Sequence, residues 1–244
     1  MFALFAAVSG TLINALTVLA GGLAGTFLGN RLPQRIQESL FGALGLFTLL
    51  VGLADPLSAL KTLNPLVLLG ALLAGTIIGE AIDIEGWLQR FGNRVQARLA
   101  REGSTLSEAF VSSSLVFCVG PLSILGALDN GLNGDITKLA IKSTLDGFGA
   151  LAFSAALGWG VLLSIGTILI YQGAISLSAG ALAPLLNANP QLITALTATG
   201  GLILVAIGIK LMKIRDLRPA NMLPALLIAP ALVALLALLS GIPH

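Results

Sequence analysis

The sequence predicts an all-α, polytopic membrane protein with about eight transmembrane helices. Hydrophobic residues make up 56% of its 244 residues and charged residues only 10%, whereas a soluble domain carries about 25% charged residues to wet its surface. In addition, apolar stretches of about 20 residues, the length that spans a bilayer as a helix, follow one another along the chain. The charged residues gather in the gaps between them, as is typical of a protein whose outer surface faces lipid.

Eight spans occupy nearly the whole chain, so residues 1–244 are expected to form a single transmembrane domain without a soluble part. Breaker residues such as Asp55–Pro56 and Asn187–Pro190 separate the spans. The first stretch is too long and too poorly flanked for a cleaved signal peptide, so we expect it to be a retained span. The expected spans are 5–28, 37–54, 64–82, 107–128, 137–157, 160–181, 191–210 and 221–241.

The basic residues favour eight spans over seven. Ten of the 13 Lys and Arg residues lie in the gaps after spans one, three and seven, and the positive-inside rule places such residues in the cytoplasm. These gaps share one side only if the uncharged stretch around Gly158–Trp159–Gly160 contains a break between two helices. Both termini are then expected outside the cytoplasm.

The longest gap predicts an interfacial amphipathic helix over 84–101. Apolar residues recur there at helical spacing, and arginines occupy another face; the two sets are Ile84, Trp87, Leu88, Phe91, Val95 and Leu99, and Arg90, Arg94, Arg98 and Arg101. Such a helix lies on an anionic lipid surface, which makes membrane lipids an expected partner. A helix that binds a regulatory partner is the alternative.

The first and last thirds of the chain resemble each other. Without gaps, Gly10–Ile13 aligns with Gly166–Leu169, Gly45 with Gly201, and Gly52 with Gly208. Repeat units at 5–82 and 160–241 would flank a central pair at 107–157 and run in opposite directions through the membrane. Inverted repeats recur in secondary transporters, whose sites lie near the bilayer midplane. The alternative is a chance echo between two Gly- and Leu-rich segments.

Charged residues inside the fifth span mark a candidate substrate- or ion-binding site. An ionised group in mid-bilayer costs roughly 2.5–3.5 kcal/mol on insertion scales. Lys138, Lys142 and Asp146 are spaced by four and share one helix face. Asp146 is the candidate for binding a proton or cation, and Lys142 for pairing with Asp146 or with an anionic group of the substrate. A purely structural ion pair is the alternative.

The fourth span adds a stripe of small and polar residues. Ser114, Cys118, Pro121 and Asp129 fall on one face if the helix is continuous. Pro121 removes a backbone donor, and with Gly120 it predicts a kink or break whose free amides favour an anionic group. The serine is alternatively a packing contact, and Cys118 a small apolar filler.

Spans one and six contribute Asn14 and Gln172, each of which could bind a ligand or a neighbouring helix. Cys118 and His244 are the only cysteine and histidine, so we expect no disulfide, metal site or haem. The chain has no phosphate-binding loop and no HExxH motif, and we expect neither ATP hydrolysis, other enzymatic activity nor a cofactor. The basic residues follow the membrane topology and do not predict nucleic-acid binding.

Three motifs resemble one known family. The opening Gly10–Asn14, the run Ser112–Pro121 and the segment Lys142–Gly147 resemble the YqgA/YdfK-like bacterial inner-membrane family, which is catalogued as domain of unknown function 554. The resemblance implies a multi-pass protein of the bacterial inner membrane, often labelled as a transporter. It transfers no catalytic residues.

These observations predict a secondary transporter or facilitator of a small polar or ionic solute. Its site would lie around spans four and five, with help from spans one and six. An intramembrane enzyme acting on a lipid-like substrate, with Asp146 as acid and base, is the first alternative. A non-transporting scaffold or sensor is the second. The glycine-rich faces, such as Gly21, Gly25 and Gly29, could also mediate a homodimer.

Overall fold

The computed structural model describes residues 2–29, 33–99, 106–118, 121–181 and 189–240. Within these residues the regular elements are all helices, and no β-strand occurs, as the sequence predicts. The helices form two compact units, each assembled from segments that are distant in sequence. The first unit comprises Met1–Leu44 and Trp87–Ala183, and the second comprises Gly45–Gly86 and Pro184–His244. Each predicted repeat unit contributes helices to both.

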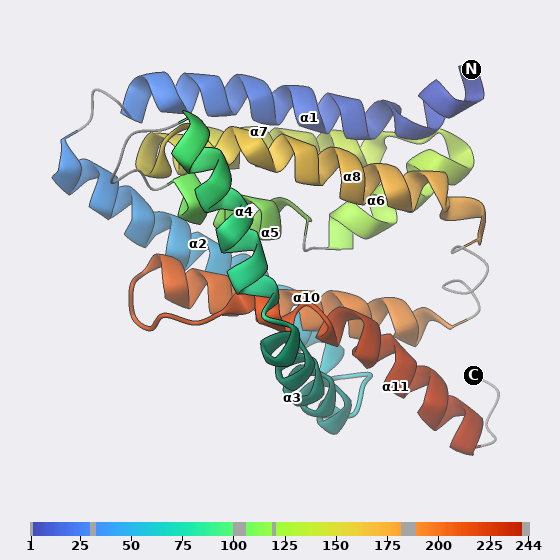
Figure 1. The fold of residues 1–244 in the computed structure, drawn as a ribbon. Helices are drawn as coiled ribbons and strands as arrows, with labels where there is room; N and C mark the ends of the chain where they lie inside the picture. The colour runs from blue at the N-terminus through green and yellow to red at the C-terminus, as the bar shows by residue number, and fades with distance from the viewer. Residues whose placement is uncertain (1, 30–32, 100–105, 119–120, 182–188, 241–244) are drawn as a thin grey trace. The chain divides into compact units, whose positions relative to one another are not determined.

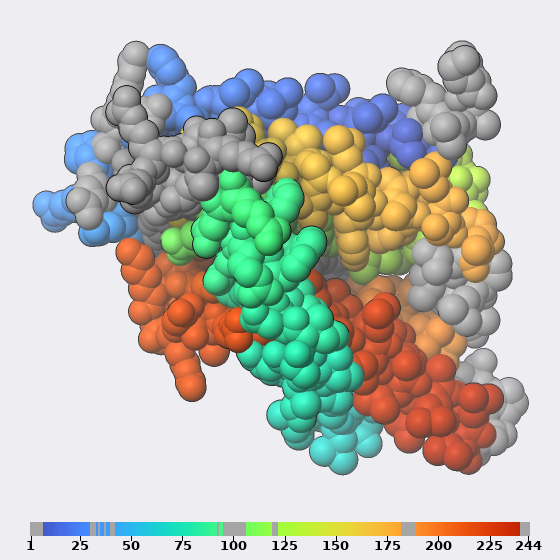
Figure 2. Space-filling model, in the orientation of Figure 1, coloured from blue at the N-terminus to red at the C-terminus, as the bar shows by residue number. Residues whose placement is uncertain are grey.

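The first unit is built around a long helix pair. In it, α1 runs along α7, while α8 packs against α1, α5 and α6 (Figure 1). The space-filling view shows α8 lying directly beside α1 (Figure 2). Its elements are α1 (Phe2–Gly29), the start of α2 (Gln34–Ala59), most of α4 (Ile84–Leu99), α5 (Leu106–Cys118), α6 (Pro121–Asn133), α7 (Thr137–Leu157), the 3₁₀ helix η1 (Trp159–Leu163) and α8 (Ser164–Leu177).

Glycines on α1 allow α7 to approach closely. A Cβ atom on Gly21 would overlap the carbonyl oxygen of Gly147, and one on Gly25 would overlap that of Leu151. Gly29 lies in the same way against α7. The glycine face of α1, which was a candidate homodimer surface in the sequence, therefore packs against α7 of the same chain.

The break predicted at Gly158 is present. The α7 helix ends at Leu157, and Gly158 has a φ of 82°, a left-handed conformation that glycine adopts without a Cβ clash. The chain then turns into η1 and α8. The basic residues thus located a helix boundary that no charged residue marks.

Six of the described helices are long and apolar enough to cross a membrane, and the pair α5 and α6, bent by 59°, is either a broken seventh span or a re-entrant loop. The remaining predicted span, the fifth, corresponds to α7, whose residues Thr137–Leu157 match the predicted range. Its charged residues Lys138, Lys142 and Asp146 make it less apolar than the other candidate spans.

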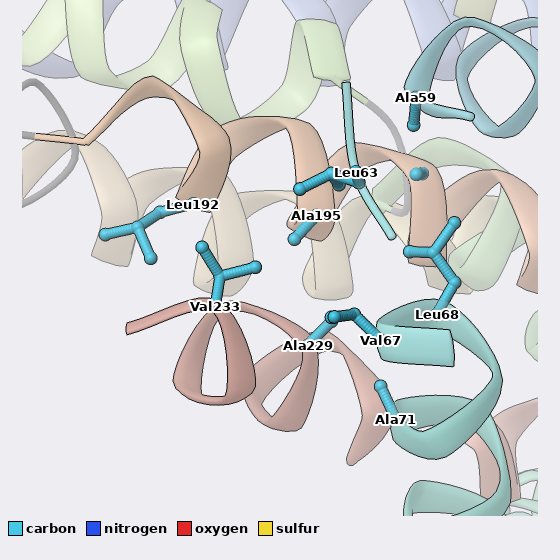
Figure 3. Close-up of a cluster of buried hydrophobic side chains, with 10 residues drawn as sticks. Ala59, Leu63, Val67, Leu68, Ala71, Leu192, Ala195, Ala229 and Val233 are labelled. Atoms are coloured by element: carbon cyan, nitrogen blue, oxygen red, sulfur yellow. The ribbon is translucent and has the colours of Figure 1, made fainter. Parts of the chain in front are cut away.

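The second unit contains a cluster of buried apolar side chains. Here α3 packs against α10 and α11, and Figure 2 shows α3 and α11 side by side. Its elements are the rest of α2, α3 (Pro65–Ile82), α10 (Pro190–Leu211), the 3₁₀ helix η2 (Pro219–Met222) and α11 (Ala225–Ser240). The buried cluster in Figure 3 consists of Ala59, Leu63, Val67, Leu68, Ala71, Leu192, Ala195, Ala198, Ala229 and Val233.

Two Asn-Pro pairs start helices in this unit. The Asn64 side chain accepts a hydrogen bond from the Leu66 N–H at the start of α3, and Asn189 accepts one from Gln191 at the start of α10. In each case the proline that follows occupies the first turn, where its missing N–H is not needed. By contrast, the helix end expected at Asp55–Pro56 is wrong. The α2 helix continues to Ala59, because membrane helices tolerate a proline whose freed backbone groups are satisfied locally.

The α2 and α10 helices cross through matching glycines. A Cβ on Gly45 would lie 3.0 Å from the Gly208 oxygen, and one on Gly208 would lie 2.9 Å from the Gly45 oxygen. Gly52 and Gly201 meet in the same reciprocal way, at 2.8 and 2.5 Å. In the internal alignment Gly45 is equivalent to Gly201, and Gly52 is equivalent to Gly208. Gly45 therefore contacts the equivalent of Gly52, and Gly52 contacts the equivalent of Gly45. A two-fold relation produces such reciprocal contacts.

Candidate functional site

Four buried polar side chains meet inside the first unit, and we call them the polar centre. They are Asn14 on α1, Lys142 and Asp146 on α7, and Gln172 on α8. All four were candidates from the sequence alone. The structure brings them together although Asn14 and Gln172 are 158 residues apart in the chain.

Asn14 connects the three helices of the polar centre. Its Nδ2 donates hydrogen bonds to Asp146 Oδ2 at 3.0 Å and to Gln172 Oε1 at 3.1 Å. The Lys142 ammonium donates to the same Asp146 oxygen and forms an ion pair with it. The side chains of Lys142 and Asp146 are only 7% and 11% exposed, so the pair is largely shielded but not completely enclosed.

Two atoms of the polar centre have no hydrogen-bond partner among the described residues. They are Asn14 Oδ1 and Gln172 Nε2. If the Asn14 amide were rotated by half a turn, its oxygen would face two acceptors, Asp146 Oδ2 and Gln172 Oε1. The Asp146 carboxylate therefore fixes the orientation of this amide. A buried polar atom left without a partner costs about 1–3 kcal/mol. The polar centre therefore has one acceptor and one donor available for a small polar ligand.

The α5 helix, which packs against α7 and α8, carries two further candidates. Ser114 shares a hydrogen bond of 3.0 Å with Thr167 on α8, and this bond joins the two helices. Cys118, the last residue of α5, is buried. Both residues therefore lie in the helix layer around the polar centre.

The remaining candidates from span four lie elsewhere. Gly120 is outside the described residues, and Pro121 begins α6. Because α5 and α6 are bent by 59°, the single stripe expected from Ser114 to Asp129 is wrong. Asp129 instead forms an ion pair with Lys138 near the α6–α7 connection, where the two side chains are 29% and 45% exposed.

Asn130, which was not among the candidates from the sequence, holds α6 against α1. Its Oδ1 accepts a hydrogen bond from the Gly10 N–H at 3.1 Å, and its Nδ2 donates to Ser9 Oγ at 3.3 Å. The sequence shows an asparagine just after a predicted apolar span, and an asparagine in that position is equally typical of a turn. Its buried position depends on packing against a helix 120 residues away.

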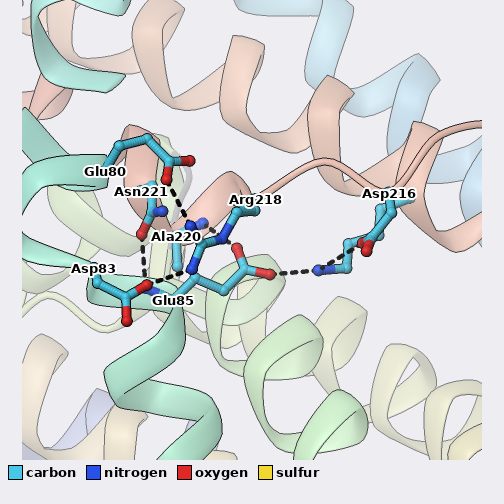
Figure 4. Close-up of polar contacts among 8 residues, drawn as sticks. Glu80, Asp83, Glu85, Asp216, Arg218, Ala220 and Asn221 are labelled. Carbon is cyan, nitrogen blue, oxygen red and sulfur yellow. Dashed lines mark hydrogen bonds and ion pairs between the residues drawn. The ribbon is translucent and has the colours of Figure 1, made fainter. Parts of the chain in front are cut away.

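A second polar cluster, in the second unit, was also missed. Glu85, at the start of α4, has a side chain that is 0% exposed and pairs with Lys210 on α10. Its other oxygen accepts the Ala220 N–H at 3.2 Å, and its own N–H donates to Asn221 Oδ1 at 2.7 Å (Figure 4). These contacts join the start of α4 to the end of α10 and to η2.

Arg218 adds a more exposed pair of contacts to this cluster. It binds Asp83 and, at 2.6 Å, Glu80, both from the α3–α4 junction (Figure 4). The hydrogen bond to Asp83 and the nearby charge of Glu80 raise the pKa of the Arg218 guanidinium above its ordinary value, so this cation stays charged at every accessible pH. In the described part of the chain, no group of three or more His, Cys, Asp or Glu residues could hold a metal ion.

Comparisons with known proteins agree with the membrane fold. The sequence profile of a family described as "Protein of unknown function (DUF554)" matches residues 9–234. The chain is 34% identical over 232 residues to "Uncharacterized protein YqgA" of Escherichia coli (strain K12), covering 93% of this chain and 97% of that protein. It is 27% identical over 225 residues to "Uncharacterized membrane protein YdfK" of Bacillus subtilis (strain 168), covering 92% and 95%. No solved structure matches the chain.

Proposed function

The chain belongs to the DUF554 family of membrane proteins, and we propose that it moves a small polar or ionic solute across a bacterial inner membrane. The observation that carries the proposal is the polar centre: an ion pair and two amides from three helices, with one free acceptor and one free donor. Apolar residues of similar size would often stabilise a protein more than a buried ion pair does. Its presence therefore favours a functional use.

The polar centre can take up and release charge. With Asp146 ionised and Lys142 protonated, the pair has no net charge and suits the interior of a membrane. Binding a proton at Asp146 would neutralise the carboxylate and leave the Lys142 ammonium to attract an anionic group. Asn14 and Gln172 would orient the bound species through Asn14 Oδ1 and Gln172 Nε2.

Two features of the helices support transport over a static core. The bent α5–α6 pair is the kind of interrupted helix that forms sites in secondary transporters. The reciprocal glycine contacts between α2 and α10 agree with an inverted repeat. Separately from these two features, the distribution of basic residues supports an orientation with both termini in the periplasm.

The exposed aromatic residues of α4 support a lipid partner. Trp87 and Phe91 are exposed, and their ring centroids lie 6.3 Å apart in a stacked arrangement. Aromatic and arginine side chains on one helix match an anionic lipid surface. We therefore place α4 at the membrane surface.

The test combines ligand binding with uptake. Purified protein is screened by thermal shift against small metabolites and ions, and each ligand found is then measured for uptake into proteoliposomes. We expect Asp146→Asn to abolish both the thermal shift and the uptake. The matched control, Asp216→Asn, removes an exposed carboxylate in the second unit and should leave both unchanged. Full uptake by Asp146→Asn would contradict the proposal.

A further inference from the structure

Five polar side-chain atoms in the first unit are buried and have no partner among the described residues. One, Ser154 Oγ, lies on α7, and the other four lie on α1 and α8. Two of these four are the free atoms of the polar centre, Asn14 Oδ1 and Gln172 Nε2, and the others are Thr11 Oγ1 and Ser176 Oγ. All four side chains are almost completely inaccessible. Since each such atom costs about 1–3 kcal/mol when it is left unpaired, the grouping needs an explanation.

These atoms lie along one seam between α1 and α8. Thr11 and Asn14 are three residues apart on α1, while Gln172 and Ser176 are four residues apart on α8, so each pair shares a helix face. The two helices pack against each other, and the hydrogen bond from Asn14 to Gln172 joins their polar faces. The seam therefore continues for one helical turn beyond the polar centre.

The α6 helix extends the polar seam towards an exposed end of the unit. A Cβ on Gly131 would overlap the Ser176 carbonyl oxygen, so α6 lies directly against this part of α8. Asn130, which precedes Gly131, accepts a hydrogen bond from the Gly10 N–H on α1. Asp129 comes before it and forms the partly exposed ion pair with Lys138. Polar groups thus run from that exposed pair to the buried Asp146 carboxylate.

We propose that this seam between α1, α6 and α8 holds a file of water molecules that carries protons between the Asp129–Lys138 pair and Asp146. Buried water typically makes about three hydrogen bonds to polar groups that are otherwise unpaired. Water can donate to Asn14 Oδ1, accept from Gln172 Nε2, and do either with the hydroxyls of Thr11 and Ser176. The seam thereby deepens the proposed function, on which it rests, by naming the proton as the coupling ion.

The polar centre favours a proton over a metal cation. Cations such as Ca²⁺ or Mg²⁺ need about six or more oxygen ligands, and the Lys142 ammonium already occupies one oxygen of Asp146. A metal ion would have to lie beside this positive charge. A proton needs only one free lone pair of the carboxylate, and a chain of hydrogen-bonded water delivers it without moving a heavy atom.

The test for water uses silver ions, a probe small enough to enter a narrow water-filled path. In a Cys118→Ala background, single variants Thr11→Cys, Ser176→Cys and Ser154→Cys are exposed to silver nitrate in chloride-free vesicles. The protein is then unfolded, and the remaining thiols are labelled with a fluorescent maleimide. Ser154 is the matched control, because its hydroxyl is equally buried and unpartnered but lies beside Gly22 on α1, on the other side of the polar centre from Thr11.

We expect the thiols at positions 11 and 176 to react at least about tenfold faster than the thiol at position 154, which corresponds to about 1.4 kcal/mol in free energy of activation. Equal rates at the three positions would overturn the water file. A further variant, Ile170→Cys, places the thiol where the side chain is 76% exposed on α8. It should react slowly, since a thiol in lipid stays protonated; a rate equal to that of Ser176→Cys would also overturn the proposal.

Proton conduction is tested separately. A pH-sensitive dye inside proteoliposomes reports proton entry, which Ser176→Leu should slow about tenfold by filling the seam, while Ser154→Leu should not. Silver accessibility does not depend on which solute is moved. Slow reaction at positions 11 and 176 with normal solute uptake would therefore refute only the water file, and fast reaction with uptake unaffected by Asp146→Asn would refute only the proposed function.

Discussion

The two units of this protein differ in what they bury. The first encloses the ion pair of Lys142 and Asp146 together with amides and hydroxyls that lack described partners. The second contains a buried cluster of alanine, leucine and valine, and it buries Glu85 and Asn221 where helices end. A membrane protein gains stability from close apolar packing and loses it by burying polar groups. The difference is the reason that the proposed function assigns the solute site to the first unit and treats the second as a stable frame.

The largest effect is expected from breaking the buried ion pair. Lys142→Met should lower the free energy of unfolding by about 3–5 kcal/mol, because it leaves the Asp146 carboxylate buried without its cation. Chemical unfolding in detergent micelles measures the loss.

The double variant Lys142→Met with Asp146→Leu provides the control. It removes both charges and should regain most of the stability while losing transport. A double variant that is as unstable as the single one would show that the pair is needed for folding, and the contrast between the units would then fail.

The charged cluster of the second unit should also be sensitive, because Glu85 is completely buried. Glu85→Ala removes the buried partner of Lys210 and the acceptor of the Ala220 N–H, and it should cost about 3 kcal/mol in the same unfolding measurement. Asp216→Asn, a change at the exposed neighbour of Lys210, should cost nothing measurable. In contrast to Lys142→Met, Glu85→Ala protein that remains folded at low temperature should retain transport.

Glycine contacts test how tightly the frame is packed. Gly79→Ala would place a methyl group onto the Asn221 carbonyl and should destabilise the protein by about 1–3 kcal/mol. On the same helix, Gly70 has only one atom near an added Cβ, at 3.8 Å. Gly70→Ala should therefore be neutral or slightly stabilising, and similar losses at both positions would mean that α3 is not packed against η2 as described.

The smallest effect is expected at the exposed part of the charged cluster. Arg218→Ala removes its ion pairs with Glu80 and Asp83, in which all three side chains are substantially exposed. Surface pairs of this kind contribute little and are weakened further by salt. The melting temperature should change slightly at low ionic strength and not at all at high ionic strength; a large loss at high salt would give Arg218 a buried structural role.

Much of the helical framework could be predicted because it depends on local sequence. A span needs about 20 apolar residues, and this length requirement placed the bounds of α7 and the division at Gly158 correctly. Pro56 misled the prediction, since a proline inside a membrane helix does not have to end it. The local sequence thus predicted where the helices lie, but it placed the end of α2 too early because of Pro56.

The candidate site was predicted in part. Asp146 and Lys142 were evident because a charge inside an apolar stretch is costly, and their spacing of four predicted the ion pair that forms. Asp129 was misplaced because the stripe argument assumed one straight helix, whereas α5 and α6 are bent. Glu85 gave no signal, since it lies in a charged gap where solvent exposure is the normal expectation.

The sequence alone determined that this chain is a helical membrane protein and which of its residues are expensive to bury, because both properties depend on the solvent that each stretch of chain prefers. Only the tertiary structure decided that Asn14 meets Gln172 across 158 residues and that Glu85 meets Lys210 across 125. Such partners are selected by how whole helices pack against one another. That selection depends on side-chain shape and glycine contacts distributed over the chain, which no local pattern contains.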